Sequence, residues 1–215
     1  MGVSPYVKQE LTRLRDENEA LRDEISTLQS RLDSVQTLAE IVESLEPGPD
    51  VMPVLDRIMY GALSLINASA GFLLVLDEET DELVFVLERG IGGEPVTGRR
   101  MPANKGLAGW VVLNRKPTIA NHAQVDDRFY AGMTSLPQFR VPSILAAPII
   151  GGGRVLGVLE GLSKQDGLPF NTFDQTLLTL LCRLTGEFLF VMIQQDERKP
   201  AGDTGQAAPP QGPPG

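Results

Sequence analysis

The chain has 215 residues, of which 42% are hydrophobic and 22% charged, as in ordinary globular proteins. Its formal net charge of -9 argues against nucleic acid and anionic membrane surfaces as partners, because both attract basic proteins. Its single cysteine, Cys182, excludes an intramolecular disulfide and a zinc site built from cysteines, and no other metal site is expected.

The sequence shows no secretory or membrane-spanning pattern. The stretch Met1–Glu10 lacks the apolar segment of a secretory signal. The most apolar stretch, Thr176–Ile193, is interrupted by Arg183 and Glu187, so we expect a packed helix there rather than a membrane span. These features predict a cytoplasmic protein without a membrane partner.

A heptad repeat runs through residues 1–45. The steps between core positions alternate between three and four, which is the period of a left-handed coiled coil. With Leu11 at position a, the a and d positions are Leu11, Leu14, Asn18, Leu21, Ile25, Leu28, Leu32, Val35, Ala39 and Val42. We therefore predict a dimerisation helix about 50 Å long.

The alternative to a coiled coil is one amphipathic helix that lies on its own domain. The narrow a/d stripe and the leucines at d favour the coiled coil, because a helix packed on a core usually has a wider apolar face. Asn18 at an a position would pair with its twin in a parallel dimer. In the same arrangement Glu10 faces Arg15 and Glu17 faces Arg22 across the interface. The pattern thus predicts a parallel homodimer.

A short hinge separates the heptads from a domain. Two prolines and a glycine within residues 46–50 break the helix. Apolar residues then recur at helical spacing from Val51 to Ile66. Two strand-like runs, Ala70–Leu76 and Leu83–Gly90, flank a polar turn and predict a hairpin.

The middle of the domain mixes loops with short elements. A glycine-rich loop reaches Asn104 and is followed by a predicted short helix over Gly106–Pro117 and a short strand over Thr118–Asn121. The long polar and aromatic segment Asn121–Arg140 has room for one short helix. We interpret the glycines of the first loop as a source of flexibility, since they match no phosphate-binding motif.

The last part of the chain contains a second hairpin and a long helix. The strands are predicted over Ser143–Ile150 and Val155–Ser163, and the helix from Phe170 to about Gln195. Residues 198–215 are rich in proline and glycine and are predicted to be disordered. The order of elements indicates an α+β domain over residues 51–197, with a central antiparallel sheet flanked by helices.

Three segments of this domain resemble the GAF domain family. The first two are Gly106–Asn121, similar to the short mid-domain helix and following strand, and Ser143–Leu162, similar to the last hairpin. The third is a motif in which the family has Asn-Lys, a spacer, Phe, three residues and Asp-Glu. This chain has Lys, Phe and Asp at the matching places, but Ser and Gln replace Asn and Glu; the positions are Ser163, Lys164, Phe170, Asp174 and Gln175.

The resemblance implies a fold, a structural ion pair and a ligand pocket. In the family the motif's Lys and Asp join the last strand to the last helix, which would be Lys164 and Asp174 here. Its members bind cyclic nucleotides, bilins, haem or small metabolites, or bind nothing, and many are dimeric modules of signalling proteins. The segments that line the family pocket hold Trp110, His122, Phe129, Tyr130, Ser135, Phe139 and Ser143.

The chain's one histidine and one cysteine give little support for catalysis. His122 could ligate haem or act as a base, but no second titratable partner stands at a diagnostic spacing, so an ordinary loop histidine fits better. Covalent bilin would need a cysteine in the pocket region, where residue 121 is Asn. Sulfoxide-reducing members of the family use several cysteines, whereas Cys182 has no resolving thiol in its chain and fits core packing.

The sequence therefore favours a non-catalytic sensor or regulatory module. A ligand in the pocket would shift loops and terminal helices, and the coiled coil would carry the change. The alternative is a ligand-free dimerisation adaptor whose GAF-like surface binds another protein. Because no kinase, cyclase, phosphodiesterase or helix-turn-helix pattern is present in these residues, both hypotheses send the signal through a partner protein. The identity of a small-molecule ligand or cofactor does not follow from the sequence.

Overall fold

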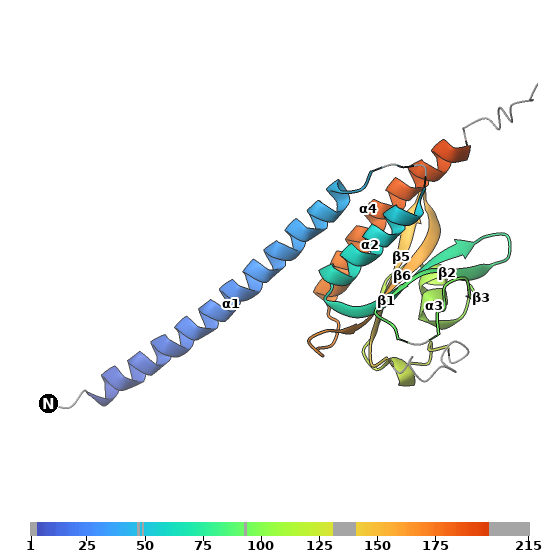
Figure 1. Ribbon diagram of the computed structural model, residues 1–215. Coiled ribbons are helices and arrows are strands. Elements are labelled where there is room, and N and C mark those ends of the chain that lie inside the picture. Colours follow the sequence, from blue (N-terminus) through green and yellow to red (C-terminus); the bar gives the residue numbers. More distant parts are fainter. Residues whose placement is uncertain (1–3, 47, 49, 93, 131–140, 198–215) are drawn as a thin grey trace, which may run out of the picture.

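A computed structural model describes residues 4–46, 48, 50–92, 94–130 and 141–197 of the chain. One long helix leads into a domain in which further helices lie against a sheet (Figure 1). The long helix, α1, spans Pro5–Glu43, which is about 58 Å at 1.5 Å per residue. Pro5 suits its first turn, where no intrahelical partner exists for the missing N–H.

The centre of the domain is one antiparallel sheet of six strands within the described residues, in the order β3-β2-β1-β6-β5-β4. This confirms the α+β fold class with a central antiparallel sheet. The strands are β1 (Ala68–Asp77), β2 (Glu82–Arg89), β3 (Arg100–Pro102), β4 (Thr118–Ala120), β5 (Ile144–Gly151) and β6 (Arg154–Lys164).

The strand β3 was not expected, since residues up to Asn104 were predicted to be loop. It pairs with the start of β2, with Val84 opposite Arg100. Arg100 donates hydrogen bonds to Asp77 at 2.8 Å and to Glu82 at 3.0 Å, which ties this edge to the first hairpin. A strand of three residues is too short to produce an alternating pattern, so its pairing is set by these contacts between distant residues.

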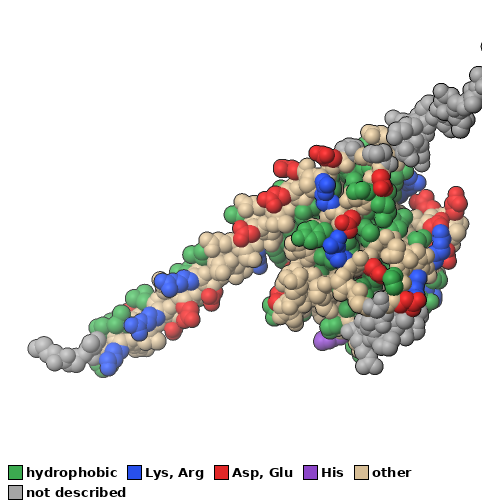
Figure 2. All heavy atoms as spheres, in the orientation of Figure 1, with side chains coloured by type: hydrophobic (Ala, Val, Ile, Leu, Met, Phe, Trp, Pro, Cys, Tyr) green, Lys and Arg blue, Asp and Glu red, His purple; other side chains and the backbone are tan. Residues whose placement is uncertain are grey.

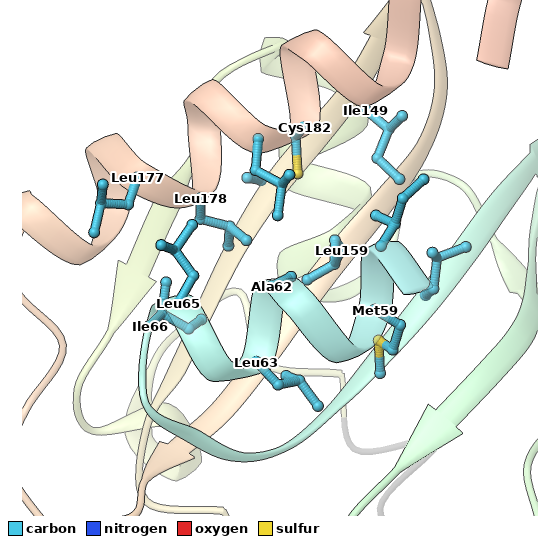
Figure 3. Close-up of a cluster of buried hydrophobic side chains, with 14 of the residues drawn as sticks. Met59, Ala62, Leu63, Leu65, Ile66, Ile149, Leu159, Leu177, Leu178 and Cys182 are labelled. Atoms are coloured by element: carbon cyan, nitrogen blue, oxygen red, sulfur yellow. The ribbon is translucent and has the colours of Figure 1, made fainter. Parts of the chain in front are cut away.

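Two helices cover one face of the sheet: α2 (Met52–Leu65) and α4 (Thr172–Glu197). Their buried side chains interdigitate with those of the central strands, as Met59, Leu159 and Leu178 illustrate (Figure 3). The end of α1 joins this layer through Leu38, and Ile41 packs against α2. This face therefore contains the larger of the two cores and also anchors the long helix.

The helix α4 is apolar along much of its length. Over Thr172–Gln195 it is long and apolar enough to cross a membrane by length and composition, with a mean hydropathy of 1.7. In this structure Leu177, Leu178 and Leu181 are instead buried against the sheet. The helix was predicted to start at Phe170, but it starts at Thr172 because the Asn171 side chain accepts hydrogen bonds from the backbone N–H groups of Phe173 and Asp174.

The opposite face of the sheet is covered by α3 (Gly106–Asn114), the 3₁₀ turn η1 (Ala123–Val125) and loops. The helix α3 ends before the predicted Pro117, because Arg115 adopts a left-handed conformation with φ of 54°. A second apolar core forms under α3 and includes Phe72, Leu107 and Val158. The sheet thus has an apolar layer on each side.

Close contact between α4 and β5 depends on two glycines. A Cβ atom at Gly186 would lie 2.2 Å from the carbonyl oxygen of Ile150, and one at Gly151 would lie 2.1 Å from the carbonyl oxygen of Gly186. Both neighbours are backbone atoms that cannot rotate away. Glycine at these two positions therefore sets how closely the last helix approaches the sheet.

We predict that Gly186→Ala destabilises the domain by about 1–3 kcal/mol, because the helix must move away from β5. In a helix without such contacts, the same substitution would instead raise stability by about 1 kcal/mol, because alanine favours the helix over glycine. A loss of stability therefore indicates the close contact with β5. Urea unfolding followed by circular dichroism measures the change. Gly92→Ala is the matched control, since a Cβ there meets nothing within 4 Å. Equal stabilities for the two variants would contradict the packing shown here.

Candidate functional site

A cavity of about 70 Å³ lies between the sheet, α3 and the segment that follows η1. Its walls are mainly apolar and aromatic, with Phe72 from β1, Phe85 from β2 and Leu162 from β6. Phe72 and Phe85 meet edge to face, with ring centroids 5.1 Å apart. Phe129 and Tyr130 complete the aromatic part of the wall. Apolar walls with few polar groups are typical of small-molecule sites.

One carboxylate, that of Glu160, lies in this apolar wall. Glu160 belongs to β6, where it is paired with Phe72 of β1 on one side and Ala146 of β5 on the other. The residue is only 8% exposed, and no other described residue donates a hydrogen bond to its side chain. Burial raises the pKa of this carboxyl from 4.5 to about 7. The cavity therefore contains a buried acid that is close to half ionised at neutral pH.

The alternation of β6 places Glu160 in the cavity wall. Successive side chains of a strand point to opposite faces, so Val158, Glu160 and Leu162 face the α3 side while Leu159 faces α2 and α4. Glu160 was not among the pocket residues predicted from the sequence. The available signal was a lone acidic residue between Val158 and Leu162, on a strand face that is otherwise apolar.

The structure brings two of the predicted pocket residues, Phe129 and Tyr130, to the cavity wall. Trp110 of α3 does not line the cavity. Its indole is half-buried, and the guanidinium carbon of Arg128 lies over the ring, 5.2 Å from the ring centroid. That arginine is held by Asp126 at 2.7 Å, which lowers the pKa of the Asp126 carboxyl. Arg128 therefore links the segment after η1 to Trp110 of α3.

The other predicted pocket residues are dispersed. Ser143 is buried beside the start of β5 but does not line the cavity. His122 is exposed just before η1. Phe139 and Ser135 lie outside the described residues. Within the described part of the chain, no group of three or more His, Cys, Asp or Glu side chains could hold a metal ion.

A larger hollow of about 860 Å³ lies on the helical side, between the start of α2, the end of α4 and the central strands. Aliphatic side chains such as Leu55, Val75 and Leu189 line it. The charged residues around it include Glu78 and Arg154, which form an ion pair at 3.4 Å. Despite its size, none of its described lining residues is a buried polar group that could orient a ligand, so we assign the candidate site to the smaller cavity with Glu160.

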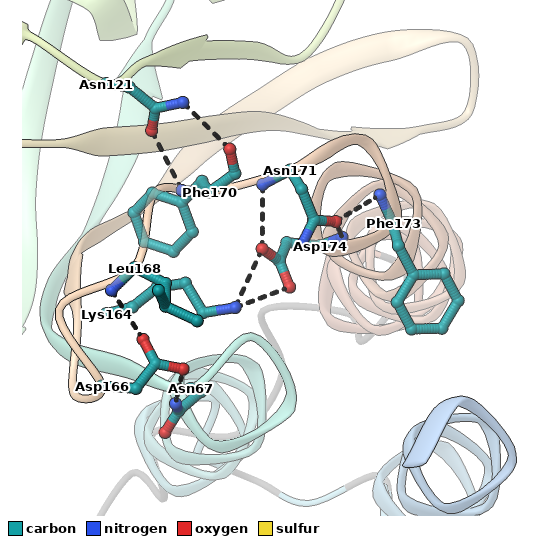
Figure 4. A network of polar contacts seen from close by, with 9 residues as sticks. All are labelled: Asn67, Asn121, Lys164, Asp166, Leu168, Phe170, Asn171, Phe173 and Asp174. Carbon is teal, nitrogen blue, oxygen red and sulfur yellow. Dashed lines mark hydrogen bonds and ion pairs between the residues drawn. The ribbon is translucent and has the colours of Figure 1, made fainter. Parts of the chain in front are cut away.

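The GAF-like motif residues form a polar network at one end of the sheet (Figure 4). Lys164 of β6 contacts Asp174 of α4 at 3.2 Å, and both side chains are nearly buried. Asn121, just after β4, exchanges two hydrogen bonds of 3.0 Å with the backbone of Phe170. These contacts join β4, β6 and the start of α4. The ion pair implied by the resemblance is thus present, and it lies outside the cavity.

The comparison with protein families matches the description "GAF domain" to residues 50–189, more than half of the chain. The chain belongs to the GAF domain family. Among curated proteins, it is 27% identical over 124 residues to a probable 3',5'-cyclic phosphodiesterase, pde-5, of Caenorhabditis elegans. Over 77 residues it is 29% identical to the rod cGMP-specific 3',5'-cyclic phosphodiesterase subunit alpha of Bos taurus.

These matches cover 54% and 36% of this chain, but only 17% and 9% of the two phosphodiesterases. Solved structures extend the likeness of fold. The GAF domain of a phosphoenolpyruvate-protein phosphotransferase from Coxiella burnetii matches with a TM-score of 0.67 and 19% identity, covering 77% of this chain and 98% of that one. Free methionine-R-sulfoxide reductase of Neisseria meningitidis, in complex with its substrate, matches at 0.62 and 21% identity, with coverages of 76% and 91%.

We predict that Glu160 makes the GAF domain less stable as pH rises from 5 to 8. The folded pKa of about 7 exceeds the ordinary 4.5, so folding favours the protonated acid. The protein therefore has the full benefit below pH 4.5 and loses it as pH rises through 7, a change of roughly 2–3 kcal/mol between pH 5 and 8. Urea unfolding at both values measures it. Glu160→Gln should remove this part of the pH dependence and be the more stable protein at pH 8; identical pH profiles would refute the assignment.

We also predict that the thiol of Cys182 is inert in the folded protein. Cys182 lies in the helical core (Figure 3), while the cavity residues belong to the core on the other face of the sheet, and burial raises the pKa of its thiol from 9.0 to about 12. At pH 8 the reaction with DTNB should be at least about a hundredfold slower than in urea, because the thiolate is the reactive form. Rapid stoichiometric reaction without denaturant would contradict this packing.

Proposed function

We propose that this GAF protein is a non-catalytic sensor or regulatory module of cytoplasmic signal transduction. It acts as a homodimer joined by a parallel coiled coil, and it passes a signal to a partner protein. The GAF fold supports a sensory or regulatory role. The exposed heptad stripe of α1 is the observation that carries the dimer, and the Glu160 cavity favours a sensor over the ligand-free adaptor.

The stripe of α1 is unusually exposed for large apolar side chains. Seven of its members have exposed fractions between 48% and 58% in the single chain: Leu11, Leu14, Leu21, Ile25, Leu28, Leu32 and Val35. Hydrophobic side chains lie along this outer side of the helix (Figure 2). These seven side chains do not pack on the chain's own domain, which supports a coiled coil over a helix that lies along its own domain. A contiguous apolar surface of this kind supports association with a second helix.

The last turns of α1 have a second apolar side, which packs on the domain. Leu38 is buried, while Ile41 and Leu45 pack against the helical core. Ile41 lies against Gly61 of α2, and the guanidinium of Arg31 lies 5.3 Å from the ring centre of Phe173 on α4. A change in the position of α2 or α4 would therefore move the end of α1 and, through it, the heptad part of the same helix.

The strand β6 provides a physical route from the cavity to that helical layer. Glu160 contributes to the cavity wall, and the adjacent Leu159 is fully buried under α2 and α4. A ligand that moves β6 or changes the charge of Glu160 would act on both faces of the sheet. Coupling of this kind needs two arrangements of the packed elements with different ligand affinity.

The same geometry supports a non-catalytic role. The sulfoxide reductase that shares the fold is an enzyme, and this chain's single thiol is buried on the opposite side of the sheet from the cavity. Its raised pKa disfavours the thiolate that nucleophilic chemistry requires. Neither Glu160 nor Tyr130 in the cavity wall has a described basic partner that would form a catalytic pair.

The dimer is tested by light scattering coupled to size-exclusion chromatography. We expect twice the chain mass of 23.3 kDa, and we expect Leu21→Asp with Leu28→Asp to give a monomer because two charges enter the apolar seam. Ala20→Asp with Ser30→Asp adds the same charges outside the a and d positions and should remain dimeric. A monomeric wild-type protein would overturn the proposal.

Disulfide trapping tests the parallel orientation. In a Cys182→Ser background, Leu14→Cys places a thiol at a d position, where twin residues face each other only in a parallel pair. We expect nearly complete cross-linking under mild oxidation. Asp16→Cys, on the outer side of the helix, serves as the control and should cross-link poorly. Equal yields for the two variants would indicate that the helices do not pair in this register.

A further inference from the structure

We propose that the cavity of this GAF domain binds a small organic cation, whose N–H groups donate to the Glu160 carboxylate and whose carbon skeleton contacts the surrounding aromatic rings. The inference rests on the proposed sensor function and names the chemical class of its ligand. It follows from three features of the described residues: the carboxylate of a buried residue that receives no hydrogen bond from them, an aromatic wall and the absence of a basic side chain from the cavity lining.

The carboxylate is the directional group of the cavity. An ionised carboxylate only accepts hydrogen bonds, and burying one without a donor is costly. No described residue supplies that donor to Glu160, and apolar residues such as Leu162 and Ile144 surround it. A ligand with a protonated nitrogen would supply both the missing donor and the opposite charge. Hydrogen bonds between two ionised groups are also stronger than neutral ones.

The aromatic rings suit the same type of ligand. Phe72, Phe85, Phe129 and Tyr130 come from two strands and one loop and converge on the cavity. The faces of aromatic rings attract cations, and their surfaces also pack against alkyl groups. A chain of a few carbon atoms ending in an ammonium group would satisfy both the rings and the carboxylate.

Charge and size argue against a phosphate-containing ligand at this site. The described residues that line the cavity include no Lys, Arg or His. Arg128, in the same loop as Phe129, is occupied by Asp126 and lies over Trp110. From the described lining residues, a phosphate would therefore meet the Glu160 carboxylate and no compensating cation. The volume of about 70 Å³ admits only a ligand with few non-hydrogen atoms.

The test compares three probes of similar size on the full-length dimer: butylammonium chloride, 1-butanol and sodium butyrate. Binding is followed by NMR titration at pH 8 and constant ionic strength. We expect butylammonium to bind at least tenfold more tightly than 1-butanol, and butyrate not to bind. Glu160→Gln should reduce the difference between butylammonium and 1-butanol to less than twofold. The control Glu43→Gln removes one exposed charge on α1 and should leave it unchanged.

Repeating the titration at pH 6 provides a second readout. Butylammonium is charged at both pH values, so its affinity should fall by up to about tenfold at pH 6 as Glu160 becomes protonated. Tyr130 is the other titratable group in the described wall, and we predict no change for Tyr130→Phe in this pH dependence. Absence of butylammonium binding at 50 mM, affinity equal to that of 1-butanol, or unchanged affinity in Glu160→Gln would each overturn the cation proposal.

The failure of this inference can be separated from failure of the proposed function. Light scattering on the same samples reports the oligomeric state independently of the probes. A dimer that does not prefer the cation would retain the dimeric module and reject the ligand class. A monomer that binds butylammonium through Glu160 would retain the ligand class and reject the coiled-coil dimer.

Discussion

The pairing of β1 with β6 at the centre of the sheet is the constraint on which the rest of the domain depends. In the middle of β6, Leu159 belongs to the core under α2 and α4, whereas Val158 and Leu162 belong to the core under α3, so apolar side chains of this strand face both sides of the sheet. The helices that anchor α1 pack on one side, and the cavity forms on the other. Glu160 is the one charged side chain among these apolar residues in the middle of β6, and it lies in the wall of the cavity.

Much of this architecture could be predicted from periodicity. The heptads predicted one long helix, and four strand-like runs predicted the strands of the two hairpins to within two residues at each end, because these patterns are local. The strand β3 and the start of α4 at Thr172 were missed, since they depend on Arg100 contacting the first hairpin and on the Asn171 side chain. For the site, the loop aromatics Phe129 and Tyr130 were predicted, whereas Glu160 needed the register of β6 against β1 and β5.

Ser163 stands where the family motif has asparagine, and the structure shows what this replacement changes. Ser163 has a φ of 45°, a left-handed conformation that asparagine tolerates better than serine, and its hydroxyl is buried without a partner among the described residues. The neighbouring Lys164–Asp174 pair is nevertheless intact at 3.2 Å. The ion pair therefore holds the end of β6 to α4 without the motif's asparagine, and the two hydrogen bonds of Asn121 hold the end of β4 to the segment before α4.

The buried carboxylate of Glu160 has a consequence for how this protein changes over generations. A residue that lowers stability at neutral pH is under steady pressure to be replaced, since a glutamine or an aliphatic side chain there would give a more robust fold. Random substitution should remove such a residue quickly from any lineage in which the cavity has no task. Whether descendants of this protein keep or lose the acid at position 160 would therefore indicate in which of them the cavity is still used.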